Sequence, residues 1–304
     1  MTRYAVTVTG EVEHSRLGLT LSHEHLYGMP PHGNDQDLVL NNVEIAISEV
    51  NLFKRAAGTT IVEVTTPDYG RQLEALRTIS LKTGINIIAA TGFHKEEWSA
   101  RITQSMSVED MIKRFSSELI EGENGIRAGV IKVASSLKEI TPNEEKVFIA
   151  AAETQKIYGC PITTHTEAGE LADAQVELLK QHGAYLEKVI IGHLDRKLDI
   201  EYHKRILRHG VYIGVDQIGK VKYGSDEARA EHILNLIKLG YLRQILISGD
   251  LARRSYWTSF GGSPGLSNIP VTFVDLLART GVKPSEIETL LYNNPSTVFA
   301  YVEK

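Results

Sequence analysis

Eight short apolar runs, each followed by a segment with helical spacing, constrain the fold of this chain more than any other feature. The expected strands cover residues 19–26, 59–65, 86–91, 128–134, 161–166, 189–193, 211–218 and 245–250. Helices are expected at 42–57, 71–83, 108–120, 143–158, 170–182, 201–209 and 226–239, with two more near 271–280 and 284–291. Alternation of this kind indicates a parallel sheet that is buried on both faces. Eight such units in 304 residues predict an α/β fold of the closed (β/α)8 TIM barrel type.

The segments outside the eight repeating units are expected to form a short hairpin and loops. Residues 4–13 alternate between apolar and polar side chains, which predicts a short N-terminal β-hairpin before the barrel. Residues 27–40 and 92–99 are expected to be loops. No GxGxxG motif follows an early strand, which argues against a dinucleotide-binding fold. Without a linker or low-complexity segment, residues 1–304 are expected to form one domain.

Composition excludes several classes of partner. The net charge of −5 and the pI of about 6.1 give no basic field for nucleic acid or an anionic membrane. The start of the sequence lacks the apolar core of a signal peptide, and no run of about 18 apolar residues is present. The single cysteine, Cys160, fits a reducing compartment and is not expected to be a nucleophile. We therefore expect a cytoplasmic protein that acts on a small molecule; a homodimer is compatible with the sequence.

Two histidines stand one residue apart at the end of the first expected strand. Side chains at i and i+2 of a strand point to the same face, so His23 and His25 could chelate a borderline metal ion. In an isolated pair of this kind, it is more common for one histidine to be buried and hydrogen-bonded and the other to lie on the surface, without a metal ion. Here, however, further metal-ligand side chains end later strands, and in a barrel these ends form the active-site mouth. They are Lys132, His165, His193 and Asp250.

Six other histidines fall in expected loops or helices and are interpreted as solvated or packing residues. They are His14, His32, His182, His203, His209 and His232.

Lys132 lies within an apolar strand, where an unpaired ammonium group is costly to bury. One interpretation is a lysine that extends to the barrel rim. The functional interpretation is a lysine whose lowered pKa lets the free amine react with CO2. The resulting carbamate is an anion with two oxygens, and it could bridge two metal ions.

Five motifs resemble the phosphotriesterase-like group of the amidohydrolase superfamily. They are SHEHL at 22–26, IKVAS at 131–135, THT at 164–166, IGHLD at 191–195 and ISGD at 247–250. The resemblance keeps their order over essentially the whole chain. It implies a binuclear centre, with one ion on His23, His25 and Asp250 and the other on His165 and His193. Carboxylated Lys132 and a hydroxide would bridge the two ions.

The implied chemistry is hydrolysis. Two metal ions about 4 Å apart make hydroxide available at neutral pH and polarise the substrate oxygen. Asp250 is placed to accept the hydroxide proton and pass it to the leaving oxygen. Imidazole and carboxylate ligands suit zinc, with manganese or cobalt as alternatives. Asp250 and Lys132 are therefore the expected catalytic residues.

Substrate identity is expected to come from the loops. Basic and aromatic residues follow the last two strands and suggest an anion site, since guanidinium and ammonium groups suit phosphate. These residues are Lys220, Lys222, Arg253 and Tyr256. Solvated loop charges are the alternative. Within the resembled family, a branch that hydrolyses phosphorylated sugar lactones is similar to this arrangement. Organophosphates or acyl-homoserine lactones would need an apolar pocket, to which Phe93, Trp98 and Trp257 could contribute.

The sequence thus predicts a binuclear metal-dependent hydrolase that opens a lactone, most simply a phosphorylated furanose lactone. Organophosphate triesterase or acyl-homoserine lactonase activity is the alternative within the same class. In another class, the barrel would bind a metal or a sugar phosphate without catalysis.

Overall fold

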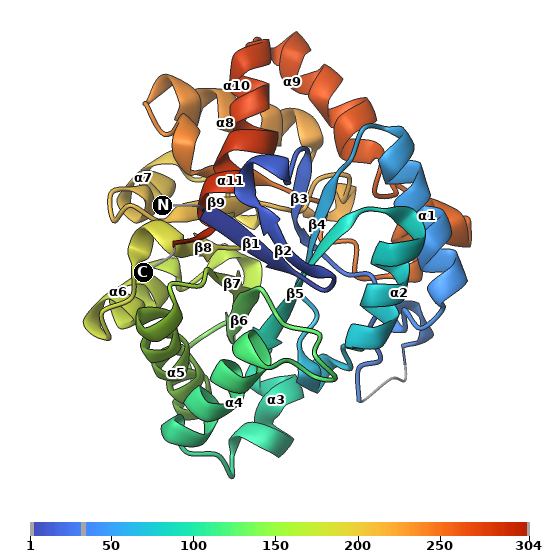
Figure 1. Cartoon of the computed structure of the whole chain (residues 1–304). Helices are drawn as coiled ribbons and strands as arrows, with labels where there is room; N and C mark the ends of the chain where they lie inside the picture. The colour runs from blue at the N-terminus through green and yellow to red at the C-terminus, as the bar shows by residue number, and fades with distance from the viewer. Residues whose placement is uncertain (1–2, 32–34, 303–304) are drawn as a thin grey trace.

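Eight strands form one parallel sheet. Figure 1 shows strands at the centre of the molecule and helices around them. The computed structural model describes residues 3–31 and 35–302. Each strand pairs with the next one along the chain, which confirms the predicted TIM barrel. The strands are β3 (Thr20–Glu24), β4 (Thr60–Glu63), β5 (Asn86–Gly92), β6 (Val130–Ser135), β7 (Ile162–Thr166), β8 (Val189–Ile191), β9 (Tyr212–Val215) and β10 (Ile245–Ile247).

The first and last barrel strands, β3 and β10, are joined partly through serine side chains. Ser22 Oγ donates to the carbonyl oxygen of Ile247 at 3.1 Å, and the backbone N–H of His23 donates to Ser248 Oγ at 3.0 Å. Beyond them, the N–H of Asp250 donates to the carbonyl oxygen of His23 at 3.1 Å. This seam places His23 and Asp250 side by side.

The alternation of side chains along each strand separates two apolar layers. In β6, Ile131 and Val133 point outward and belong to the large core between strands and helices. Val130 points inward and belongs to a smaller core together with Ile88 and Leu246. Lys132 has the same inward parity as Val130, so the strand directs its amine into the barrel.

Helices surround the strands in the expected order. They are α1 (Val43–Arg55), α2 (Leu73–Thr83), α3 (Glu96–Thr103), α4 (Val108–Ile120), α5 (Pro142–Tyr158), α6 (Ala172–Gln181), α7 (Ile200–Leu207), α8 (Asp226–Lys238), α9 (Val274–Thr280), α10 (Pro284–Glu288) and α11 (Asn294–Val298). The loop predicted at 92–99 is wrong in its second half, because α3 begins at Glu96. None of the helices in the described part of the chain is long and apolar enough to cross a membrane.

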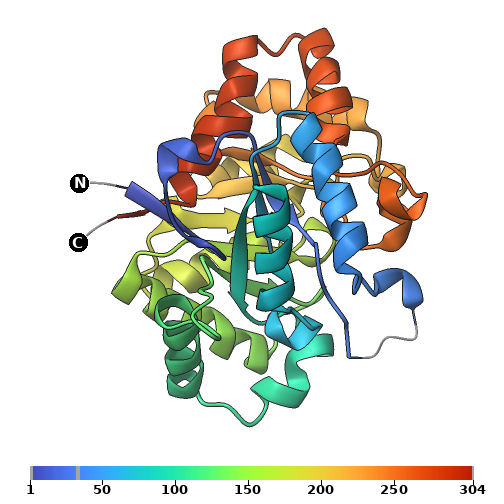
Figure 2. The same cartoon turned by 45° about the vertical axis from the view of Figure 1, so that its right-hand side comes forward.

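A small antiparallel sheet covers one end of the barrel. The predicted hairpin is present as β1 (Arg3–Thr7) and β2 (Gly10–Glu13), and β11 (Tyr301–Val302) pairs with β1 beside it, as Figure 2 shows. The N–H of Val8 donates to the carbonyl of Ile87 at 2.9 Å, at the amino end of β5. The hairpin therefore closes the amino ends of the strands and leaves their carboxyl ends for a site.

Candidate metal centre

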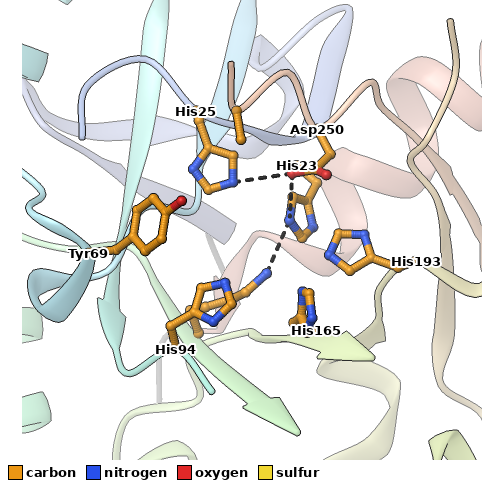
Figure 3. A pocket seen from close by; sticks show the side chains of 9 residues that line it. His23, His25, Tyr69, His94, His165, His193 and Asp250 are labelled. Carbon is orange, nitrogen blue, oxygen red and sulfur yellow. Dashed lines mark hydrogen bonds and ion pairs between the residues drawn. The ribbon is translucent and has the colours of Figure 1, made fainter. Parts of the chain in front are cut away.

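The six residues predicted to bind metal lie around one cavity at the carboxyl ends of the strands (Figure 3). The cavity is lined by His23, His25, Tyr69, His94, Lys132, His165, His193, Asp250 and Ala252. Ligand atoms of His23, His193 and Asp250 lie within 4.8 Å of one another. His25 Nε2 lies 3.2 Å from Asp250 Oδ1, and Lys132 Nζ lies 3.1 Å from His23 Nε2. Imidazole nitrogens and a carboxylate at this spacing fit a divalent ion such as zinc.

Two of these residues have backbone conformations that non-glycine residues rarely adopt. His193 has φ of 60° and Asp250 has φ of 47°, both in the left-handed region. Such conformations cost about 1–3 kcal/mol and persist only where the surroundings enforce them. His193 lies two residues beyond the end of β8 and Asp250 three beyond the end of β10, and both side chains line the cavity.

Hydrogen bonds donated by Nδ1 orient two of the histidines. Thr65 Oγ1 lies 2.7 Å from Nδ1 of His25, and the threonine hydroxyl itself donates to Glu63. The Thr65 oxygen therefore accepts the Nδ1 proton. Nδ1 of His193 lies 2.7 Å from an Asp216 carboxylate oxygen. With Nδ1 protonated, each ring offers the lone pair of Nε2 to the cavity, and such partners typically orient metal-binding histidines.

Asp216, just after β9, was not among the predicted site residues. Its carboxylate accepts from His193 and also lies 3.5 Å from Nδ1 of His23. Burial alone would raise its pKa, but the adjacent His193 and His23 hold the pKa below its usual range. Gly214 makes room for it, since a Cβ there would lie 2.6 Å from Asp216 Oδ2. A carboxylate within the apolar run 211–218 was the sequence signal, equivalent to that of Lys132.

Lys132 is 2% exposed, and its amine has no carboxylate partner among the described residues. Burial lowers the pKa of Lys132 to about 8, against the opposing attraction of Asp250 and Asp216. The free amine, which is the form that reacts with CO2, is therefore more populated near neutral pH than in an exposed lysine.

Asp250 is held from three sides. Lys220 Nζ donates to its Oδ2 at 2.7 Å, and Gln217 Nε2 donates to the same oxygen at 3.0 Å. Burial opposes its ionisation, but Lys220 and the adjacent His25 keep its pKa well below the usual range. Glu24 fixes the turn by accepting from the N–H groups of Gly249 and Leu251, at 2.7 and 2.9 Å.

His165 faces a carboxylate at the rim of the cavity. Its Nε2 lies 3.3 Å from Glu167 Oε2, which leaves Nδ1 for the cavity. Glu167 is shared with two cations, accepting from Lys95 Nζ at 2.8 Å and from Arg196 at 2.9 Å. Glu167 and its partners are a second contribution that sequence reasoning missed.

The four predicted substrate-binding residues have different surroundings. Lys220 is 4% exposed and bonded to Asp250, while Arg253 donates to Asp35 at 2.7 Å and to Asp37 at 3.3 Å. Lys222 has no carboxylate partner among the described residues, and its Nζ lies 5.4 Å from the ring centre of Tyr256. Lys222 and Tyr256 are therefore close together, whereas Lys220 and Arg253 are already engaged.

The remaining aromatic residues and histidines named from the sequence have different positions in the structure. Phe93 and Trp257 are buried in the large core between strands and helices and do not line the cavity, so they contribute no apolar wall to it. Trp98 packs edge-on against Tyr69 with ring centres 5.0 Å apart. His203 and His232 are buried packing residues that bond to each other, as expected, and His32 lies outside the described residues.

Fold and site together define a class: a (β/α)8 barrel whose strands gather imidazole, amine and carboxylate side chains around one cavity at their carboxyl ends. The model of the phosphotriesterase family matches residues 4–299. The chain belongs to the phosphotriesterase family, whose members are metal-dependent hydrolases.

Individual relatives match over nearly the whole chain. The phospho-furanose lactonase of Mycoplasmopsis synoviae (strain 53) is 31% identical over 330 residues, covering 99% of this chain and 93% of the relative. The crystal structure of a lactonase from Listeria monocytogenes superposes with a TM-score of 0.94 at 32% identity, covering 99% of this chain and 100% of the other. The phosphotriesterase homology protein of Escherichia coli, crystallised with phosphate in its active site, gives a TM-score of 0.90 at 31% identity, covering 93% and 99%.

Proposed function

We propose that this protein is a metal-dependent hydrolase that opens a lactone, and that the substrate is a phosphorylated furanose lactone. The observation that carries the proposal is the convergence of four histidines, Lys132 and Asp250 on one cavity. The names of the Mycoplasmopsis and Listeria relatives support the lactonase reaction. The phosphate in the active site of the Escherichia coli relative supports an anionic substrate group.

The donor set fits two divalent ions. His23, His25 and Asp250 would hold one ion, and His165 and His193 the other. Zinc suits these ligands, with manganese or cobalt as alternatives. Lys132 would bridge both ions as a carbamate: its free amine adds to CO2, an N–C bond forms, and the nitrogen loses a proton. When bound, the ions supply Lewis acidity for water and for the substrate carbonyl.

The side chains of the protein perform the proton transfer. Asp250 is ionised and lies at the cavity, so it can accept the proton of the attacking water. As the new C–O bond forms, the bond from the carbonyl carbon to the ring oxygen breaks. Asp250 then returns the proton to that oxygen, which gives a hydroxy acid. Lys220 and Gln217 hold the carboxylate in place for both transfers.

Lys222 and Tyr256 are the proposed phosphate contacts. Lys222 follows β9 and Tyr256 follows β10, and the two side chains lie beside each other. Arg253 contacts its two aspartates through Nη1, so its guanidinium keeps other donors for phosphate. Lys220 is less suited, because a contact with phosphate would compete with Asp250.

A lactone panel tests the proposal. Purified protein with its metals should release acid from phosphorylated furanose lactones faster than from unphosphorylated lactones, acyl-homoserine lactones or organophosphate triesters. A chelator should abolish the activity, and added zinc, manganese or cobalt should restore it. Tight binding of sugar phosphates with no turnover of any lactone would instead favour the non-catalytic barrel.

A further inference from the structure

His94 lines the cavity but has no part in the function proposed above. It follows β5, and its imidazole stacks on Tyr69 with ring centres 5.5 Å apart and an interplanar angle of 24°. The ring centre of His165 lies 5.0 Å away. Figure 3 shows the His94 ring beside Tyr69, on the side of the cavity away from Asp250.

One hydrogen bond determines which nitrogen of the His94 ring carries the proton. The N–H of Lys95 donates to Nδ1 of His94 at 2.7 Å, so Nδ1 is an acceptor and the ring proton is on Nε2. No described residue accepts a hydrogen bond from Nε2. His94 therefore presents an unused N–H donor at the wall of a polar cavity.

The position of His94 is rigid. Its backbone N–H donates to the Asp68 carboxylate at 3.1 Å. Tyr69, which follows Asp68 in the sequence, stacks on the His94 ring. Tyr69 is 8% exposed and packs edge-on against Trp98. A donor fixed in this way costs little entropy when it binds a substrate, so it can discriminate between closely related molecules.

The order of the strands shows on which side of the metal-ligand cluster the His94 donor lies. In a closed ring of eight strands, β5 stands opposite β9. His94 follows β5 and Lys222 follows β9, so the two lie on opposite sides of the metal-ligand cluster. In a furanose lactone phosphorylated on its exocyclic carbon, the phosphate is attached on the ring-oxygen side of the carbonyl. The hydroxyl on the carbon next to the carbonyl, C2, lies on the other side.

We propose that His94 is a specificity-determining residue that donates from Nε2 to the C2 hydroxyl of the lactone. This inference rests on the proposed function, since it takes the phosphate to be near Lys222. A site that hydrogen-bonds a substrate hydroxyl discriminates against the analogue that lacks it, because the buried donor is then left unpaired.

The test compares two substrates and three proteins. The substrates are a pentose-derived lactone phosphorylated on its exocyclic carbon and its 2-deoxy counterpart. The proteins are the wild type, His94→Asn and His94→Gln, all with their metals. An asparagine oxygen replaces Nδ1 but removes the cavity donor, whereas a glutamine amide replaces Nε2. We expect the wild type to prefer the hydroxylated lactone about tenfold in kcat/KM, His94→Asn to lose that preference, and His94→Gln to recover part of it.

The outcomes are distinguishable. If the wild type hydrolyses neither phosphorylated lactone, the proposed function fails, and this inference fails with it. If the wild type is active but His94→Asn slows both substrates equally, the inference alone is overturned. A loss of bound metal in His94→Asn would also overturn it, because His94 would then be a ligand. His182, the C-cap residue of α6, does not line the cavity, so His182→Asn serves as the control and should leave the preference unchanged.

Discussion

Asp250 is the residue at which most contacts of the site meet. It accepts from Lys220 and Gln217 and lies 3.2 Å from His25 Nε2. In Asp250→Asn the amide oxygen can still coordinate weakly, but the group cannot accept a proton at neutral pH. We expect most of the metal to remain while kcat falls by a factor on the order of 10² or more. Turnover within a few-fold of the wild type would reduce Asp250 to a ligand.

Lys222 is the single residue that best tests the phosphate pocket. Lys222→Ala should lower kcat/KM for phosphorylated lactones about ten- to a hundredfold, since a hydrogen bond to a charged group contributes about 1.5–3 kcal/mol. Unphosphorylated lactones should be nearly unaffected. Lys238→Ala, an exposed lysine on α8, is the matched control. Equal losses on both kinds of lactone would show that Lys222 supports the loop rather than the phosphate.

The residues of the site differ in how well their roles could be predicted from the sequence. Five of the six predicted ligands lie at or just beyond the carboxyl ends of strands, and Lys132 points inward from within β6, so the barrel fold alone brings them to one cavity. Asp216 could have been found by the argument applied to Lys132, since a carboxylate inside an apolar run needs a partner. His94 could not, because it stands in a loop and the direction of a loop side chain depends on contacts such as those with Asp68 and Tyr69.

Among the elements, the segment after β10 depends on one buried carboxylate of α1. Glu49 accepts from the N–H groups of Ser259 and Leu266, at 2.7 and 2.9 Å. Glu49→Gln replaces one acceptor oxygen by an NH2 group, so one of these N–H groups is left facing a donor. We expect a loss of about 1–3 kcal/mol in local stability, seen as faster hydrogen exchange at Ser259 and Leu266.

Glu44→Gln, on the exposed side of the same helix, should leave exchange at both amides unchanged. Exchange in Glu49→Gln that is as slow as in the wild type would show that other contacts hold the segment.

The elements themselves were largely predictable, for a physical reason. The eight barrel strands are buried on both faces, so each reads as an apolar run, and glycines such as Gly84 and Gly159 end helices at positive φ. The helix α3 has no side-chain N-cap and only eight residues, so little in its sequence distinguishes it from a loop. The two-residue strand β11 exists only through its pairing with β1 and has no local signal.

For the whole molecule, two buried histidines predict a dependence of stability on pH. Burial, together with the neighbouring His232, lowers the pKa of His203 to about 3, and burial lowers the pKa of His232 to about 4. In the unfolded chain both titrate near 6.5. Above that pH both histidines are neutral in the folded and in the unfolded chain, so they add no pH dependence to stability. As the pH falls from about 6.5 towards 4, only the unfolded state gains protons, and stability is lost by up to about 1.4 kcal/mol per pH unit for each histidine.

Denaturation midpoints measured from about pH 7 to pH 4 test this dependence. The double variant His203→Gln, His232→Gln should show a shallower acid slope than the wild type, although its stability at neutral pH is lower. His182→Gln, which is partly exposed, should keep the slope of the wild type. Identical slopes for the double variant and the wild type would contradict the account.

The metal content of the protein tests the central claim most directly. Metal bound per chain is measured in the wild type and in Lys132→Ala, with Lys138→Ala, an exposed lysine, as the control. The account predicts two ions per chain in the wild type and the control, and loss of metal together with activity in Lys132→Ala, partly restored by short carboxylic acids that occupy the vacated bridge. A Lys132→Ala protein with two ions per chain and normal turnover would contradict it.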